Sequence, residues 1–252
     1  MGSAETGTEQ RLIGHLVALR ARLLRAVLAV LAIFIALLPF ASRISALLSE
    51  PLRAKLPAGP QMVAIDVASP FLTPIKLALF TALILAMPVV LYQLWAFVAP
   101  GLYRHEQKLA RPLLVSAVLL FYVGCAFAYF LVLPAVFGFL TGVAPEGVAM
   151  MTDISRYLDF VLVLFLAFGF SFEVPVAVVI LVLLGWVSVE QLRESRGYVI
   201  VGAFVVAAVI TPPDVISQLM LAIPMCLLYE VGLLVARSIT RQREADAPTD
   251  SE

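Results

Sequence analysis

The stretch YLDFVLVLFLAFGFSFEVPVAVVILVLL, residues 157–184, decides the fold. An α-helix rises about 1.5 Å per residue, so a run of this length is more than enough to cross the roughly 30 Å hydrocarbon core of a bilayer. Near its middle lies a carboxylate, Glu173, and Pro175 follows two residues later. The stretch therefore predicts a membrane-spanning helix that is interrupted beside a polar group.

The composition of the whole chain agrees with a membrane protein. Of its 252 residues, 62% are apolar and 13% are charged, and the mean hydropathy is +1.04. Soluble domains average about 45–50% apolar and about 25% charged residues, so this chain has more apolar residues than the core of a water-soluble fold can bury. The balance of 17 basic and 17 acidic residues argues against a nucleic-acid-binding protein, which carries a concentrated basic surface. We predict an all-α, polytopic membrane protein.

Six apolar runs predict a bundle of six transmembrane helices. They cover residues 26–40, 75–98, 112–137, 157–184, 198–210 and 216–236. Well inside four of the runs lies a proline, which removes one backbone hydrogen bond and tends to kink a helix: these are Pro88, Pro134, Pro175 and Pro224. The fifth run has only 13 residues, which is short for a core of about 30 Å and implies local thinning of the bilayer or shielding by a partner. The predicted bundle is therefore bent.

The segments around the membrane domain, residues 26–236, complete the predicted organisation. Residues 1–25 are expected to form a retained cytosolic tail and an amphipathic helix that lies along the membrane interface before the first span. The proline-rich loop 41–74 predicts a partly structured cap on the outer side, and residues 237–252 an acidic, disordered tail.

The distribution of basic residues predicts the orientation. Six spans place both termini on one side of the membrane. If that side is the cytosol, twelve of the 17 Lys and Arg residues fall in cytosolic segments and five outside. This is the positive-inside bias, so we expect both termini in the cytosol.

Several kinds of chemistry are absent from the sequence. There is no GxxxxGK[ST] phosphate-binding loop and no HExxH metal motif. Both histidines, His15 and His105, fall in predicted cytosolic segments, far from any serine in the membrane. The sequence therefore offers no histidine–serine pair for an intramembrane protease. Cys125 and Cys226 lie in apolar runs, where a thiol behaves as a small hydrophobe. We expect no enzyme activity, no metal and no cofactor.

Glu173 is the sharpest single feature, because a charged group in the middle of a span costs about 2.5–3.5 kcal/mol. Pro175 has no N–H, so the carbonyl of Ser171 loses its helical donor and a polar notch is expected beside the carboxyl group. Glu173 could merely mend the proline kink within its own bundle. Alternatively, in its protonated form, it could donate a hydrogen bond to a polar group on a partner helix, or serve transport. We favour a functional role, as intramembrane ionisable groups usually have one.

The predicted first cytosolic loop places a second carboxylate at the membrane surface. In WAFVAPGLYRHEQKLARP, residues 95–112, Glu106 stands among basic side chains. It could balance its neighbours, or it could receive an arginine of a bound peptide through paired, charge-assisted hydrogen bonds. The spacing alone does not separate these readings. Trp95 and Phe97, at the inner end of the second run, are typical of an interfacial aromatic belt.

Five strings, in unbroken order, resemble one known family. They are HLVALRARLL at 15–24, DVASPFLTPIK at 66–76, LYQLWAFVAPGLYRHE at 91–106, FGFSFEVPV at 168–176 and GAFVVAAVITPPDVISQ at 202–218. The chain resembles the TatC family, the six-span subunits of the bacterial twin-arginine protein translocase. The similarity extends from about Arg11 to Arg237.

The resemblance implies a function and a set of site residues. It implies a receptor in the cytoplasmic membrane for signal peptides with paired arginines, which passes folded proteins to an assembly driven by the proton-motive force. The partners implied are the single-span subunits TatA and TatB, the latter in a higher-order TatBC oligomer. The positions that match the family's signal-peptide site are Arg20, Arg22, Phe97, Tyr103 and Glu106; those that match partner-helix contacts are Glu173, Thr211 and Gln218; and those that match sensitive periplasmic positions are Pro51, Phe71 and Asp214.

One departure from the family pattern bears on signal recognition. The family's N-terminal motif reads His-Leu-x-Glu-Leu-Arg, whereas this chain has Ala18 in place of the glutamate. If two carboxylates normally share the two guanidinium groups, Glu106 is left alone and a contact worth about 1.5–3 kcal/mol is lost. We therefore expect weakened recognition of the signal.

Two functions of other classes remain open from the residues alone. An ion-coupled transporter would use Glu173 as its proton site, but such proteins often show an internal repeat and paired broken helices, which this sequence lacks. A passive scaffold would have no binding pocket. Binding of a signal peptide separates the scaffold from the receptor.

Overall fold

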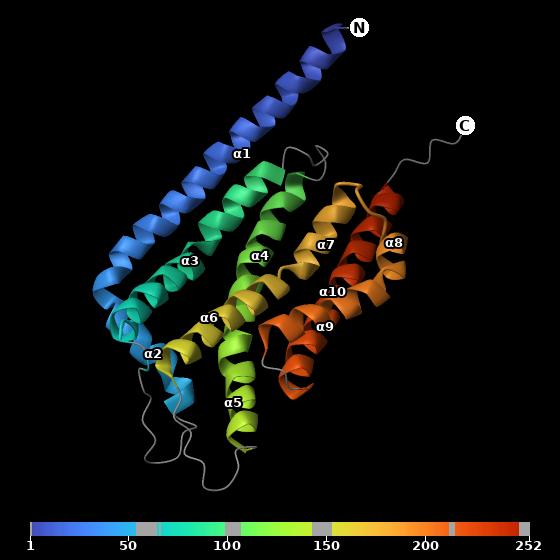
Figure 1. Ribbon diagram of the computed structural model, residues 1–252. Coiled ribbons are helices and arrows are strands. Elements are labelled where there is room, and N and C mark those ends of the chain that lie inside the picture. The colour runs from blue at the N-terminus through green and yellow to red at the C-terminus, as the bar shows by residue number, and fades with distance from the viewer. Residues whose placement is uncertain are drawn as a thin grey trace. The chain divides into compact units, whose positions relative to one another are not determined.

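The computed structural model of the chain describes residues 2–53, 65, 67–98, 107–142, 153–211 and 215–246. These residues are almost entirely helical and contain no strand (Figure 1). The α-helices are α1 (Gly2–Leu37), α2 (Ala41–Arg53), α3 (Ser69–Val98), α4 (Gln107–Phe127), α5 (Leu133–Gly142), α6 (Ile154–Ser171), α7 (Val174–Leu183), α8 (Val189–Glu194), α9 (Arg196–Ile210) and α10 (Val215–Asp246). A 3-10 turn, Leu38–Phe40, joins α1 to α2, and a π-helical turn, Ala128–Val132, joins α4 to α5. The predicted all-α class is confirmed.

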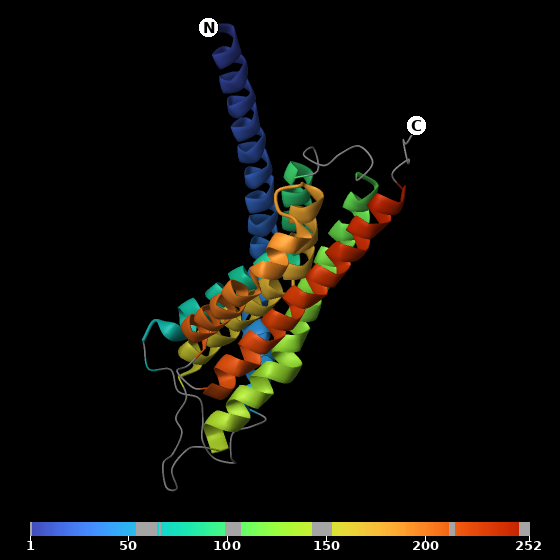
Figure 2. The same cartoon turned by 90° about the vertical axis from the view of Figure 1, so that its right-hand side faces the viewer.

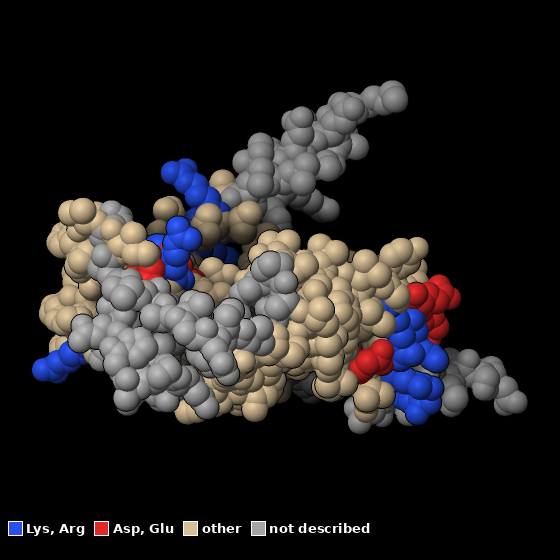
Figure 3. Space-filling model, turned by 60° about the horizontal axis from the view of Figure 1, so that its bottom comes forward, with Lys and Arg blue, Asp and Glu red and all other residues tan. Residues whose placement is uncertain are grey.

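Among the described residues, five helical segments are long and apolar enough to cross a membrane. They are Leu19–Leu48, Ser69–Phe97, Arg111–Phe139, Ile154–Leu183 and Gln218–Arg241. The fifth predicted span corresponds to α9, an apolar helix of 15 residues, which is about 22 Å long. On the face drawn in Figure 3, charged side chains gather in a few small groups and the rest of the described surface is uncharged. This is the surface expected of a protein whose solvent is largely lipid.

Contacts divide the chain into two units. The first comprises Met1–Leu47 and Ile65–Val118, and the second Leu48–Ala64 and Leu119–Glu252. In the first unit α1 packs along α3, and Figures 1 and 2 both show the N-terminal part of α1 extending beyond α3. The buried face of α3 includes a stripe of small residues, Ala78, Ala82 and Ala86, none of which is exposed. Small residues let helices approach closely in a membrane, where van der Waals packing drives helix association.

The first helix differs from its prediction. We expected residues 12–23 to lie along the membrane interface, at an angle to the first span. Instead α1 continues from Gly2 to Leu37 as one helix. The physical reason is local, because no proline lies between Leu12 and Leu37 to end the helix. Among the described residues, α1 therefore has no break at which an interfacial segment could turn into the membrane.

The outer loop and the second span also differ in their bounds. Part of the predicted cap, 41–74, is helical as α2, and residues 54–64 lie outside the described residues. The second span begins at Ser69, not at residue 75. Pro70 falls in the first turn of α3, where a missing N–H costs little, and the helix continues through Pro74, so neither proline delays the start of the helix.

The second unit is built on α6, α7 and α10. α10 packs against both α7 and α9. The largest fully buried side chains of α4 and α6 are Phe121, Leu158, Leu162, Leu164 and Phe168. At the start of α6, the Tyr157 hydroxyl donates a hydrogen bond of 3.2 Å to the carbonyl of Leu48, which ties α2 to α6. This unit carries the predicted break beside Glu173.

Candidate functional site

The fourth span is broken where the sequence predicts. α6 ends at Ser171 and α7 begins at Val174, and the two helices meet at an angle (Figure 1). The amide of Glu173 donates to the carbonyl of Phe170 at 3.0 Å, three residues back, which is the bond of a tightened last turn. The hydroxyl of Ser171 donates to the carbonyl of Ala167 at 2.6 Å. Pro175 lies at the start of α7, where its missing N–H is tolerated.

Glu173 presents its carboxyl group at this break. The residue is half-buried, and its Oε1 atom is buried with no hydrogen-bond partner among the described residues. Its backbone carbonyl, in contrast, accepts from the amide of Ala177 at 2.9 Å and so begins α7. A buried oxygen without a partner is costly, and in native structures such an atom needs an explanation. The side chain of Glu173 also makes no capping hydrogen bond to α7. The carboxyl group therefore does not stabilise the kink by bonding to the free backbone groups at the start of that helix.

Thr211 and Gln218, the other predicted partner contacts, lie where α9 ends and α10 begins. Thr211 is buried, and its hydroxyl donates to the carbonyl of Ala207 at 2.8 Å within its own helix. Gln218 is half-buried, and its Nε2 donates to the carbonyl of Phe204 at 3.2 Å, which links α10 to α9. The hydroxyl of Thr211 is therefore committed inside the bundle, while the amide oxygen of Gln218 has capacity for a further partner.

The predicted signal-peptide residues are only partly described. Arg20 and Arg22 lie on α1, with Arg20 exposed and Arg22 half-buried. Ala18 also lies on α1, and Phe97 is half-buried near the end of α3. Tyr103 and Glu106 lie outside the described residues. The structure therefore describes only the part of this predicted site that lies on α1 and at the end of α3.

The three predicted periplasmic positions are spread over the chain. Pro51 lies on α2, and Phe71 lies in the first turn of α3 with 71% of its surface exposed. Asp214 lies outside the described residues. An aromatic side chain this exposed is free to meet lipid or another protein.

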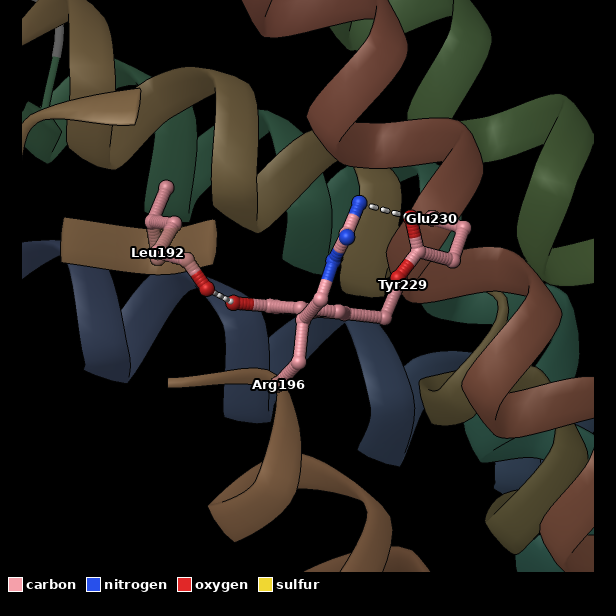
Figure 4. A network of polar contacts seen from close by, with 4 residues as sticks. All are labelled: Leu192, Arg196, Tyr229 and Glu230. Carbon is pink, nitrogen blue, oxygen red and sulfur yellow. Dashed lines mark hydrogen bonds and ion pairs between the residues drawn. The ribbon is translucent and has the colours of Figure 1, made fainter. Parts of the chain in front are cut away.

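The sequence reading missed one polar network, which joins α8 and α9 to α10 (Figure 4). Arg196 Nη2 lies 2.7 Å from Glu230 Oε2, and the Tyr229 hydroxyl donates to the carbonyl of Leu192 at 2.7 Å. From the sequence, Arg196 is only one of the twelve basic residues in the predicted cytosolic segments. No short-range spacing could have revealed its partner, since Arg196 and Glu230 are 34 residues apart.

The described residues contain no cluster of His, Cys, Asp and Glu that could hold a metal ion. The described side chains of the candidate site, Glu173, Thr211 and Gln218, offer hydrogen bonding and a titratable carboxyl group. The described residues form a helical protein with several apolar spans, one of them broken beside a carboxyl group, which places the chain in the class of polytopic membrane proteins with a candidate functional group inside a span.

Comparison with known proteins identifies the family. Residues 14–224 match the family model described as Sec-independent protein translocase protein (TatC). The TatC protein of Azotobacter chroococcum is 59% identical over 246 residues, which cover 98% of this chain and 96% of that protein, and TatC of Escherichia coli K12 is 56% identical over 90% of this chain and 88% of that protein. A crystal structure described as the twin-arginine translocase receptor TatC, 38% identical, superposes with a TM-score of 0.81 over 90% of this chain and 100% of that one. The chain belongs to the TatC family of Sec-independent protein translocase subunits.

Membership confirms the resemblance drawn from the five sequence strings. The chain is a multi-pass membrane protein of the twin-arginine translocation system, a transport protein. The positions that the resemblance assigns to signal peptides and partner helices stay predictions.

Proposed function

We propose that this chain is the signal-peptide receptor and core subunit of a twin-arginine translocase in the bacterial cytoplasmic membrane. It holds both termini in the cytosol, as the twelve-to-five distribution of basic residues predicts. It exports folded proteins with energy from the proton-motive force. The solved relative's description as a translocase receptor supports the receptor role.

The proposed receptor site is on the cytosolic side and consists of the α1 segment around Arg20 and Arg22, the end of α3 at Phe97, and Tyr103 and Glu106 of the following loop. A twin-arginine peptide carries two guanidinium groups, and a carboxylate such as Glu106 accepts the paired hydrogen bonds of one of them. Ala18 leaves this receptor without a second carboxylate at the family position, so its affinity for the signal is reduced.

The proposed partner site is the α6–α7 break. The observation that carries it is the buried Oε1 of Glu173, which has no hydrogen-bond partner among the described residues. In the apolar part of a bilayer a neighbouring helix with a polar residue can supply what the chain does not. The single-span subunits TatA and TatB are the proposed partners, and Gln218 adds a second polar contact.

Co-purification of TatA and TatB with three forms of the chain tests the partner site. Glu173→Gln keeps a neutral side chain that can donate and accept hydrogen bonds, whereas Glu173→Ala removes both capacities. We expect the Gln variant to retain the partners and the Ala variant to lose them. Retention by both variants would contradict the proposal. Loss by both, together with proton-coupled uptake of a small solute by the chain alone, would favour a transporter.

A further inference from the structure

Two close glycine contacts flank the α6–α7 break, one on each side. The first lies where α4 crosses the last turn of α6. A Cβ atom on Gly124 of α4 would lie 2.5 Å from the backbone oxygen of Phe168, and one on Gly169 of α6 would lie 2.5 Å from Cε2 of the Phe121 ring. Such distances are not found for real Cβ atoms, so only glycine allows α4 and α6 to approach this closely.

The second contact lies at the other side of the break. A Cβ atom on Gly232 of α10 would lie 2.8 Å from Cα of Pro175 and 3.2 Å from Cβ of Val178. The backbone of α10 therefore rests against the first turn of α7. Pro175 is two residues after Glu173, and Phe168 is five residues before it.

The surroundings leave little freedom at either contact. Phe121 and Phe168 have no exposed surface, and the ring of Phe127 on α4 lies 5.4 Å from the ring of Phe168 and 5.6 Å from that of Phe172. The nearest contacts of Gly124 and Gly232 are with backbone atoms, which cannot move out of the way by a rotamer change. Close-packed interiors transmit such strain to their neighbours. A methyl group at either glycine would therefore displace the helix on its side of the break.

We infer that Gly124 and Gly232 are positioning residues for Glu173: the first holds the end of α6, the second holds the start of α7, and together they fix where the carboxyl group lies. The break needs such support because a continuous helix would fix the side chain through its own hydrogen bonds, whereas two short helices can rotate about the residues between them. The function that this positioning would serve, contact with a partner helix, rests on the proposed partner site at Glu173.

The test measures the reactivity of the Glu173 carboxyl group in the chain without partners. Dicyclohexylcarbodiimide is an apolar reagent that modifies carboxylic acids inside membranes. Its rate of reaction at Glu173 is followed by mass spectrometry of the chain in phosphatidylcholine vesicles, and Glu173→Gln serves to assign the modified site. We expect Gly124→Ala and Gly232→Ala to change this rate.

Two glycines of the same unit provide matched controls. Cβ atoms at Gly138 on α5 and Gly202 on α9 would meet nothing within 4 Å, so Gly138→Ala and Gly202→Ala should leave the rate unchanged. Reaction of a water-soluble carbodiimide at the exposed Glu190 on α8 reports on the rest of the fold and should be equal in all variants. An unchanged rate at Glu173 in both Gly124→Ala and Gly232→Ala would overturn the inference, as would an equal change in the controls.

If Gly124→Ala fails to fold, Gly169→Ala replaces it, because the atoms it meets belong to the Phe121 side chain. We expect Gly169→Ala to change the rate and the added substitution Phe121→Leu, which makes room for the methyl group, to restore it. No rescue by Phe121→Leu would contradict steric positioning. Partner co-purification is then measured separately: a changed rate at Glu173 with unchanged partner binding would leave the positioning intact and refute the partner site.

Discussion

Arg196 on α9 and Glu230 on α10 form an ion pair with 2.7 Å between Nη2 and Oε2. One residue away on α10, the buried Tyr229 donates its hydroxyl to the carbonyl of Leu192 on α8. The two contacts attach α8 and the start of α9 to α10, which also packs against α7. They differ in burial, because the side chains of Arg196 and Glu230 are 45% and 43% exposed.

This difference in burial predicts the order of two substitutions. Glu230→Gln should lower the free energy of unfolding by no more than about 1 kcal/mol, because exposed ion pairs contribute little. Tyr229→Phe should cost about 1–3 kcal/mol, because it leaves the carbonyl of Leu192 without its buried donor. Denaturation of the purified variants in detergent measures both. The reverse order would show that the ion pair between α9 and α10 stabilises the protein more than the hydrogen bond between α10 and α8.

The Tyr157 hydroxyl should stabilise the second unit in the same way. Tyr157→Phe removes the 3.2 Å bond to the carbonyl of Leu48 but keeps the ring that packs against Phe137. We expect a loss of about 0.5–1.5 kcal/mol in the free energy of unfolding. Tyr198→Phe, at a side chain that is 84% exposed, is the control and should have no effect. Equal losses in the two variants would rule out a specific role for the bond.

The crossing of α4 and α6 predicts an asymmetry between glycines. Gly124→Ala should lower the free energy of unfolding by about 1–3 kcal/mol, because the added methyl group overpacks a site bounded by backbone. Gly138→Ala should not destabilise the protein, since a Cβ atom there would meet nothing within 4 Å. Thermal unfolding of the two variants against the parent measures the difference. Equal stability of both variants would mean that α4 and α6 do not cross at Gly124.

Because Ala18 stands where the family has a glutamate, we predict that replacing it with glutamate raises the affinity for a signal peptide. Restoring the family's carboxylate with Ala18→Glu should strengthen binding of a twin-arginine signal peptide about tenfold or more, as a charge-assisted hydrogen bond is worth about 1.5–3 kcal/mol. Glu106→Gln should weaken it. Pull-down with immobilised peptide measures both, and the peptide with Lys-Lys in place of the arginines is the control, because lysine cannot form the paired contact. Unchanged binding in both variants would refute the assignment of the receptor site.

Features set by local chemistry or by the bilayer were accessible from the sequence. The apolar runs are long because the hydrocarbon core is thick, and they match five described segments and the shorter α9. The break beside Glu173 follows from the missing N–H of Pro175, and the structure confirms it. The carboxyl group stood out because a charge is costly inside an apolar run.

Features set by packing between distant residues were not accessible. Nothing near Gly124 in the sequence indicates the backbone of Phe168, and nothing near Arg196 indicates Glu230. The π-helical turn Ala128–Val132 is another feature that the sequence does not predict. It contains Phe130, whose carbonyl lacks a helical donor because Pro134 has no N–H. At Pro88 a donor is missing in the same way, yet the helix continues unbroken. A proline fixes which hydrogen bond is lost, while the neighbouring helices decide how the chain adapts.

The central claim is that the carboxyl group of Glu173 anchors a partner helix at the α6–α7 break. Its most direct test places a photoreactive amino acid at successive positions along the membrane span of TatA or TatB and maps the crosslinks on this chain. The account predicts that the crosslinks concentrate on residues 170–177, persist in Glu173→Gln and vanish in Glu173→Ala. Crosslinks that fall elsewhere, or that are equally strong in Glu173→Ala, would contradict it.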